Sequence, residues 1–252
     1  MGSFGSTAVP LQNQKVIDLS NQQLNGISSC PRNPLILILN LSNNSIQFLP
    51  KNVNSLNKLF LSNNNYVRDV PNRIIDAIVS YSNLNVLDLS YNSLSDLSEE
   101  IVYKSSLNFL YLFHNKFTNL EITYPNENLR MIGLGYNELK TIIKFESIPN
   151  LKLLELEYNK IQLFSFHHQA LQYLIISSNL INSFDLSSKL DSLTVLDISR
   201  NKIDKLPDLS QITPQLINLD ASYNLISEIP QLPTTICRLY LSHNRIQKIP
   251  KS

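Results

Sequence analysis

The sequence lacks several features that would place it in a common structural class. Only Cys30 and Cys237 are cysteines among 252 residues, which is too few for a fold held together by disulfides. No apolar run approaches the roughly 18 residues of a membrane-spanning helix, and the most apolar stretch, from Leu35 to Leu41, is seven residues long. The start of the chain, from Met1 to Val9, has neither the basic residues nor the apolar segment of a secretory signal. The net charge is only +1, which argues against nucleic-acid binding because such proteins usually carry a basic excess.

What the sequence does contain is a repeat rich in leucine and asparagine. The pattern is Leu-x-x-Leu-x-Leu-x-x-Asn-x-Leu, with other apolar residues at some leucine positions; Leu84, Leu87, Leu89, Asn92 and Leu94 form one copy. The asparagine position recurs every 20 to 28 residues in eleven copies, at Gln22, Asn44, Asn64, Asn92, Asn115, Asn137, Asn159, Asn179, Asn201, Asn224 and Asn244. Ten of the eleven positions hold asparagine, so the register is not accidental.

The pattern has a physical explanation. The Leu-x-Leu alternation is that of a strand with one buried face. Such short strands are stable only when they stack in register, and parallel stacking merges the leucines of successive coils into one core. The sharp turn after each strand leaves backbone amides and carbonyls without ladder partners. An asparagine side chain both donates and accepts, so we expect a column of asparagines to satisfy these groups.

With these residues the chain resembles the leucine-rich repeat family over about residues 14 to 250. The resemblance implies an α/β solenoid, a right-handed superhelix with eleven short parallel strands on the concave face and a mostly irregular convex side. The 20- to 23-residue copies resemble both intracellular scaffold and bacterial-effector subclasses. In the 28-residue copy, residues 72–79 after Pro71 predict a convex helix. We assign residues 1–13 to an N-terminal extension or cloning remnant and residues 14–252 to one domain of eleven repeats.

No catalytic constellation, cofactor motif or metal-ligand spacing is apparent, so we expect no enzymatic activity, no cofactor and no metal site. The adjacent pair His167–His168 is more typical of a return loop than of a ligand pair. The segment Met1–Ser6 matches the N-myristoylation pattern at Gly2, for which a cloning remnant is the alternative explanation. We expect a cytoplasmic location, with membrane tethering through Gly2 as the alternative.

The expected binding surface is the concave face of the middle repeats. Serine follows the second strand leucine in most copies, but Phe113, Gly135 and Glu157 replace it in three consecutive copies. Aromatic residues gather there around Phe109 and Tyr111, and Met131 is expected to be exposed in the next copy. We expect Gly133 and Gly135 to leave a shallow gap beside them. The predicted partner-binding residues are Tyr91, Phe109, Tyr111, Phe113, His114, Tyr136, Glu155, Glu157, Tyr158 and Tyr173.

Charge indicates the kind of partner. Six acidic residues against three basic ones are expected on the concave face: Asp18, Asp88, Glu155, Glu157, Asp197 and Asp220 against Lys58, Arg200 and Arg238. Such a face suits a protein or peptide with basic and apolar side chains. The last strand, within residues 237–242, has no following strand, which makes an edge-to-edge dimer one alternative.

The pattern therefore predicts a non-enzymatic protein-binding scaffold or recognition domain in signalling, which holds a partner on its concave face. The alternative is a sensing module of a larger signalling enzyme or receptor, such as a kinase, phosphatase, cyclase or ubiquitin ligase. A fold of this kind does not by itself specify a reaction.

Overall fold

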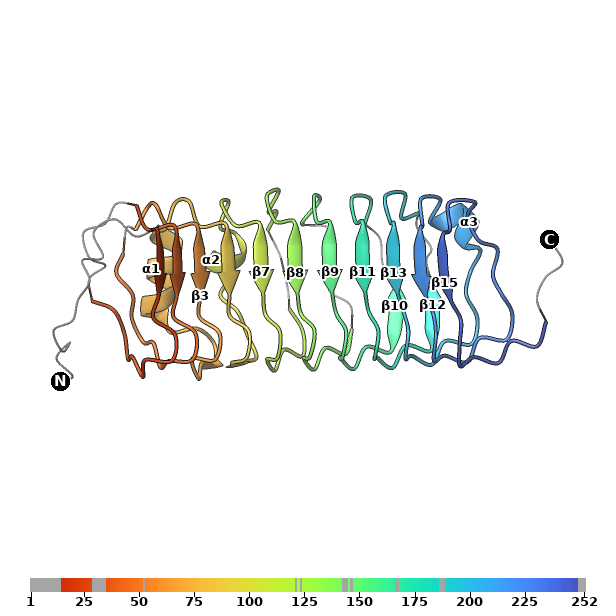
Figure 1. Ribbon diagram of the computed structural model, residues 1–252, viewed down its shortest axis with the longest axis horizontal. Helices are drawn as coiled ribbons and strands as arrows, with labels where there is room; N and C mark the ends of the chain where they lie inside the picture. The colour runs from red at the N-terminus through yellow and green to blue at the C-terminus, as the bar shows by residue number, and fades with distance from the viewer. Residues whose placement is uncertain are drawn as a thin grey trace.

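The computed structural model describes residues 15–28, 35–51, 53–120, 122, 124–141, 145, 147–165, 168–185 and 189–248. Several expectations fall outside these residues: the myristoylation motif at Gly2, the cysteine at Cys30, and the first histidine of the pair, His167. Within the described residues the chain forms one elongated solenoid, with the strands side by side along its length (Figure 1).

Eleven strands of three residues each form a single parallel sheet, in which each strand pairs in register with the next copy of the repeat (Figure 1). The strands are β1 (Val16–Asp18), β2 (Ile38–Asn40), β3 (Lys58–Phe60), β5 (Val86–Asp88), β7 (Phe109–Tyr111), β8 (Met131–Gly133), β9 (Leu153–Glu155), β11 (Tyr173–Ile175), β13 (Val195–Asp197), β14 (Asn218–Asp220) and β15 (Arg238–Tyr240). The predicted solenoid with eleven parallel strands is confirmed.

The central residue of each strand points into the core. Leu87, Leu110 and Ile132 are aligned by the register of β5, β7 and β8, and all three are fully buried. The same holds along most of the sheet, so that the buried side chains of successive coils form one continuous apolar core along the solenoid. The residues on either side of each central position point to the opposite face, and in most strands they keep some exposure.

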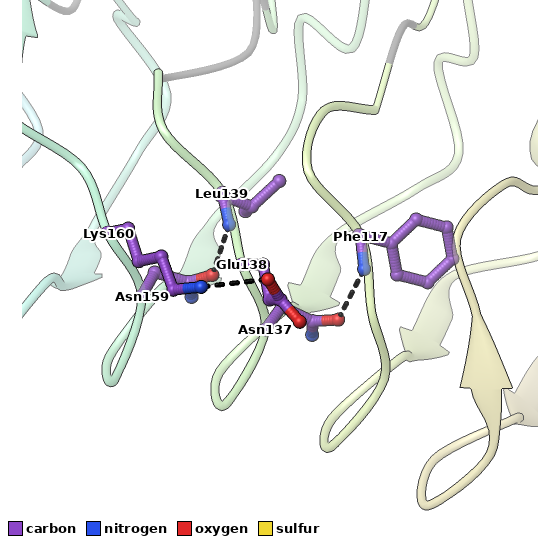
Figure 2. A network of polar contacts seen from close by, with 6 residues as sticks. All are labelled: Phe117, Asn137, Glu138, Leu139, Asn159 and Lys160. Atoms are coloured by element: carbon purple, nitrogen blue, oxygen red, sulfur yellow. Dashed lines mark hydrogen bonds and ion pairs between the residues drawn. The ribbon is translucent and has the colours of Figure 1, made fainter.

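The asparagine column closes the turn after each strand. The side chain of Asn137 accepts a hydrogen bond from the Phe117 amide at 3.1 Å, as Figure 2 shows. Its Nδ2 donates to the carbonyl of Leu112 in the preceding coil and to those of Leu134 and Gly135 in its own, at 2.9 to 3.2 Å. The side chain thus satisfies four backbone groups and links two coils.

The degenerate first copy follows the same rule. The Asn44 side chain accepts from the amides of Gln22 and Leu24, so the first coil is tied to the second as the others are. Gln22 uses its own Nε2 to donate to the Ser20 carbonyl at 3.1 Å, which is the intra-coil bond that asparagine makes elsewhere. The inclusion of this copy in the repeat is therefore confirmed.

The convex side is mostly irregular, as predicted. The expected helix is α1 (Asn72–Ser80), which starts directly after Pro71 and buries Ile74, Ile75, Ala77 and Ile78. The sequence did not predict two short helices, α2 (Glu99–Val102) and α3 (Leu209–Ile212). It also did not predict two pairs of short parallel strands. These are β4 (Val67–Arg68) with β6 (Ser93–Leu94), and β10 (Leu163–Ser165) with β12 (Ser183–Asp185).

Replacing one ladder residue tests the role of the column. In Asn159→Ala the Leu139 amide loses its side-chain acceptor within the core. The Leu134 and Leu156 carbonyls each lose one of two side-chain donors and keep the other, from Asn137 and Asn179. A buried group left unsatisfied costs about 1–3 kcal/mol, so we expect the free energy of unfolding to fall by about 1–3 kcal/mol in urea denaturation. The exposed Asn182→Ala is the control. Equal stability of the two variants would contradict the role assigned to the column.

Candidate functional site

The concave face is built from parallel rows of side chains, one residue per coil. One row begins each strand and contains Lys58, Val86 and Phe109, and the next ends each strand and contains Phe60, Asp88 and Tyr111. Two residues further on lies the third row, and the turn residue after it forms a fourth. Because neighbouring strands lie about 4.8 Å apart, residues of the same row are direct neighbours across coils.

The predicted rings of β7 form one wall of a hollow on this face. Phe109 is exposed, Tyr111 and Phe113 are half-buried, and the Tyr111 and Phe113 rings lie 6.1 Å apart at 27°. The hollow has a volume of about 510 Å³ and lies over β5, between the β7 rings and Phe60 on β3. It forms because β5 and the turn after it present the short side chains of Val86, Asp88 and Ser90 between coils that carry rings. These three side chains also line the hollow.

The predicted gap at the two glycines is wrong. The Phe113 ring lies over Gly133, so close that a Cβ there would be 2.3 Å from the ring. Likewise the Glu157 carboxylate lies over Gly135, where a Cβ would approach Oε1 to 2.4 Å. The glycines are buried, and they are needed to let neighbouring side chains lie flat on the sheet. They shape the site by placing Phe113 and Glu157.

The predicted single aromatic patch is in fact two surfaces. Tyr91, His114, Tyr136 and Tyr158 occupy the turn row, where their rings stack face to face with centroids 4.2, 4.1 and 4.3 Å apart. All four have left-handed backbone, with φ from 51° to 57°. Such a conformation costs about 1–3 kcal/mol for a residue other than glycine, and ring stacking offsets part of that cost. We call these four residues the edge stack.

A second stack in the same row was missed from the sequence. The Tyr223 ring stacks on His243 at 4.0 Å, and the Arg200 guanidinium lies 4.4 Å from the centroid of the Tyr223 ring. The signal was available, because all three residues hold the position directly before a ladder asparagine. Ser178 interrupts the row between the two stacks.

Tyr173 lies apart from the hollow. In its row Met131 and Leu153 stand between it and Phe109, so that three strand spacings, about 14 Å, separate the backbones of Tyr173 and Phe109. Met131 was expected to be exposed on this face but is buried. Tyr173 is nevertheless exposed and remains on the same face as the hollow.

Four of the six acidic residues on the face have a local structural role. Each carboxylate Oδ1 accepts the amide of the serine two residues later at 2.9 or 3.0 Å, which ends the strand: Asp18, Asp88, Asp197 and Asp220. At Asp18 the bond from the Ser20 amide lowers the pKa of the carboxyl. Asn40 makes the equivalent bond to Ser42 at 3.1 Å, so a neutral amide serves the same structural purpose.

Glu155 and Glu157 differ from these four. Both are half-buried, and burial raises the pKa of each carboxyl; the charge of Glu157 adds to the rise at Glu155, and that of Asp197 to the rise at Glu157. Glu157 Oε2 is buried, and none of the residues that the structure describes hydrogen-bonds to it. Across Gly133, Glu155 faces Tyr111, whose pKa is raised by burial first and then by the charges of Glu155 and Asp88.

The described residues contain no cluster of three or more histidine, cysteine, aspartate or glutamate side chains able to hold a metal ion. His168, of the predicted return-loop pair, is buried and bonds the Ile148 carbonyl through Nε2 at 2.8 Å. Among the helices that the structure describes, none has the length and apolar character needed to cross a membrane.

Comparison with known proteins finds matches to leucine-rich repeats. Two family models fit the chain, one described as "Leucine Rich repeats (2 copies)" at residues 169–211 and one as "Leucine Rich Repeat" at residues 83–104. Adenylate cyclase of Schizosaccharomyces pombe is 28% identical over 216 residues, which is 81% of this chain but 12% of the cyclase. Human lumican is 28% identical over 228 residues, 85% of this chain and 66% of lumican.

A solved structure of a leucine-rich repeat protein from Leptospira interrogans superimposes with a TM-score of 0.72. It is 24% identical and covers 93% of this chain and 68% of its own. At this identity the likeness concerns the fold alone. The chain thus spans a small part of the cyclase and about two thirds of the other two proteins.

The raised pKa values of Glu155 and Glu157 predict a pH-dependent stability. In the unfolded chain a glutamate carboxyl has a pKa of about 4.3. Because the pKa of both carboxyls is raised in the folded state, the folded protein binds these protons more tightly than the unfolded chain. The free energy of unfolding therefore falls as the pH rises from the unfolded pKa through the folded one. We expect a Glu155→Gln, Glu157→Gln variant to be more stable than the parent at pH 7, and the difference to shrink as pH falls toward 4.

The control is Glu138→Gln, because Lys160 lies 2.8 Å away and lowers the pKa of Glu138. That variant is expected to lose stability at pH 7 and to match the parent in acid. Thermal unfolding at several pH values measures both differences. A double variant that is less stable than the parent at pH 7 would show that the two carboxylates are not penalised by burial.

Proposed function

The chain belongs to the leucine-rich repeat family, and on that premise we propose that it is a non-enzymatic protein-binding scaffold or recognition domain that holds a partner on its concave face. The observation that carries the proposal is the aromatic hollow between β3 and β7, which is lined by rings and by the carboxylate of Asp88. The surface is rigid, because every row of side chains is fixed by strand register and by the asparagine column.

Energetics favour the hollow as the centre of the interface. Phe109, Tyr111 and Phe113 keep part of their surface in water, and burying such rings at the centre of an interface contributes about 2 kcal/mol or more each. An exposed apolar patch on a soluble repeat usually marks an interaction site. Glu155, Glu157 and Tyr173 lie further along the same face and extend the surface toward the C-terminal coils.

Charge supports a partner with basic and apolar side chains rather than nucleic acid. The acidic residues of the face outnumber its basic ones, whereas the whole chain carries +1. A phosphate backbone would be repelled, and a basic segment would be attracted. The edge stack borders the same surface and offers ring edges and hydroxyl groups to a partner that reaches beyond the hollow.

A second candidate is a sensing module within a larger signalling enzyme or receptor. The observation that favours it is the similarity to adenylate cyclase, in which the matched region is a small share of the protein. Reading the coding sequence on both sides of these 252 residues distinguishes the two candidates. A catalytic domain in the same reading frame would support the second.

We place the module in the cytoplasm. Cys237 is a free, exposed thiol, which suits a reducing compartment better than an oxidising one. Tethering to a membrane through Gly2 remains the alternative, and the intact mass of the native protein distinguishes the two by the presence or absence of a myristoyl group.

The double change Tyr111→Ala, Phe113→Ala tests the proposed site. We expect it to reduce capture of the native partner at least about tenfold in affinity purification with quantitative mass spectrometry, since two central rings are lost. The control is Tyr223→Ala, Tyr240→Ala, which removes two exposed rings from the C-terminal coils. Unchanged capture by a folded double variant would place the interface elsewhere.

A further inference from the structure

The hollow over β5 combines rings with a carboxylate that has no cationic partner among the described residues. Resting on the proposed function, we infer that this hollow is a slot for one arginine side chain of the partner, with Asp88 as the anion and the rings of β3 and β7 as its walls. The slot would fix the register of the partner along the concave face. The acidic charge of the face as a whole would attract a basic partner without fixing its register.

The walls come from the strand register. Phe60, Asp88 and Tyr111 are direct neighbours in one row, so Asp88 has a ring on each side. Two strand spacings, about 9.6 Å, separate the backbones that carry the rings, which leaves width for one side chain above Asp88. Val86 forms the floor at one end and Ser90 at the other, and Phe109 and Phe113 extend the β7 wall.

Asp88 is placed to receive a cation. Its Oδ1 accepts the Ser90 amide at 2.9 Å, and no described residue bonds Oδ2. The two ion pairs among the described residues join Lys51 to Asp76 and Lys160 to Glu138, so neither neutralises Asp88. Lys58 lines the far end of the hollow, one row away, without pairing with it. The negative charge of Asp88 reaches Tyr111, whose pKa it helps to raise.

The other aspartates of the face lack this surrounding. Asp197 is flanked in its row by Ile175 and Asp220, and Asp18 has only Asn40 beside it. Asp220 has a ring on one side, Tyr240, and another carboxylate on the other. Among the strand-end aspartates of the described residues, Asp88 alone lies between two rings.

Arginine fits this arrangement better than lysine. Its guanidinium is planar, stacks on ring faces and presents paired N–H donors that match a carboxylate. Lysine carries a compact, strongly hydrated charge that gains less from ring faces and keeps more of its water. A neutral side chain would leave Asp88 without a counter-charge between the rings.

The test uses small probes on the full chain. N-acetyl-arginine amide, N-acetyl-lysine amide and N-acetyl-citrulline amide are titrated to about 50 mM, because a cation–π contact with one charge-assisted pair corresponds to millimolar affinity. Methyl and aromatic NMR shifts of Val86, Phe109 and Tyr111 are followed. Citrulline is a planar, uncharged analogue of arginine, so it separates charge from shape.

Asp88→Asn is the decisive variant, because Asn40 shows that an amide makes the same strand-ending bond and the fold is therefore kept. Asp197→Asn is the matched control, since Asp197 makes the same bond to its serine away from the rings. We expect arginine amide to bind at least about tenfold more tightly than citrulline amide and more tightly than lysine amide. Asp88→Asn should remove that preference and Asp197→Asn should keep it.

Several results would overturn the slot. These are equal shifts with arginine and citrulline amides, a preference that survives Asp88→Asn, or no saturable shift at Val86, Phe109 and Tyr111.

Partner capture separates this inference from the proposed function. If Asp88→Asn captures the partner normally while Tyr111→Ala, Phe113→Ala does not, the slot is wrong and the binding face stands. If arginine amide binds as expected and neither variant alters capture, the slot exists and the proposed interface is wrong.

Discussion

The hydrogen bonds of the ladder asparagines are the constraint on which the rest of the structure depends. A strand of three residues that turns sharply leaves more backbone groups unpaired than its short ladder can satisfy. Each asparagine satisfies several of these groups and does so across two coils, as Asn137 and Asn159 do. Figure 2 shows the bond that each of them accepts from an amide of the preceding coil. Without this column the turns would have to lie in water, and the leucines could not form a continuous core.

The same constraint produces the binding surface. Because the turns repeat at fixed geometry, residues at equivalent positions stand in rows at strand spacing, and a ring in one coil meets the residue at the same position in the next. This explains why Tyr91, His114, Tyr136 and Tyr158 stack, although their left-handed backbone is unfavourable for such residues. It also explains the hollow, since small side chains on β5 between rings on β3 and β7 leave a space that no neighbour fills.

The sequence was sufficient for the fold, because its periodicity identified the eleven strands. The loss of serine at Phe113, Gly135 and Glu157 pointed to three coils, of which that of Phe113 lines the hollow. It did not reveal how these side chains are arranged. The glycines were expected to leave a gap, yet Phe113 and Glu157 fold over them, and Met131 was expected to be exposed but is buried. A repeat pattern gives the row of each residue but not the direction in which its side chain leans.

What the sequence by itself determined is therefore the set of positions: which repeat positions form the leucine core, which stand on the concave face, and which asparagines close the turns. These follow from periodicity, because burial alternates with strand geometry and the turn chemistry recurs at a fixed place. Tertiary structure alone decided which side chains meet: the division of the aromatic residues into a hollow and an edge stack, the rings on both sides of Asp88, and the partial burial of Glu155 and Glu157. The physical reason is that these contacts join residues 20 to 28 positions apart in the sequence, and only the stacking of whole coils brings them within a few ångströms of each other.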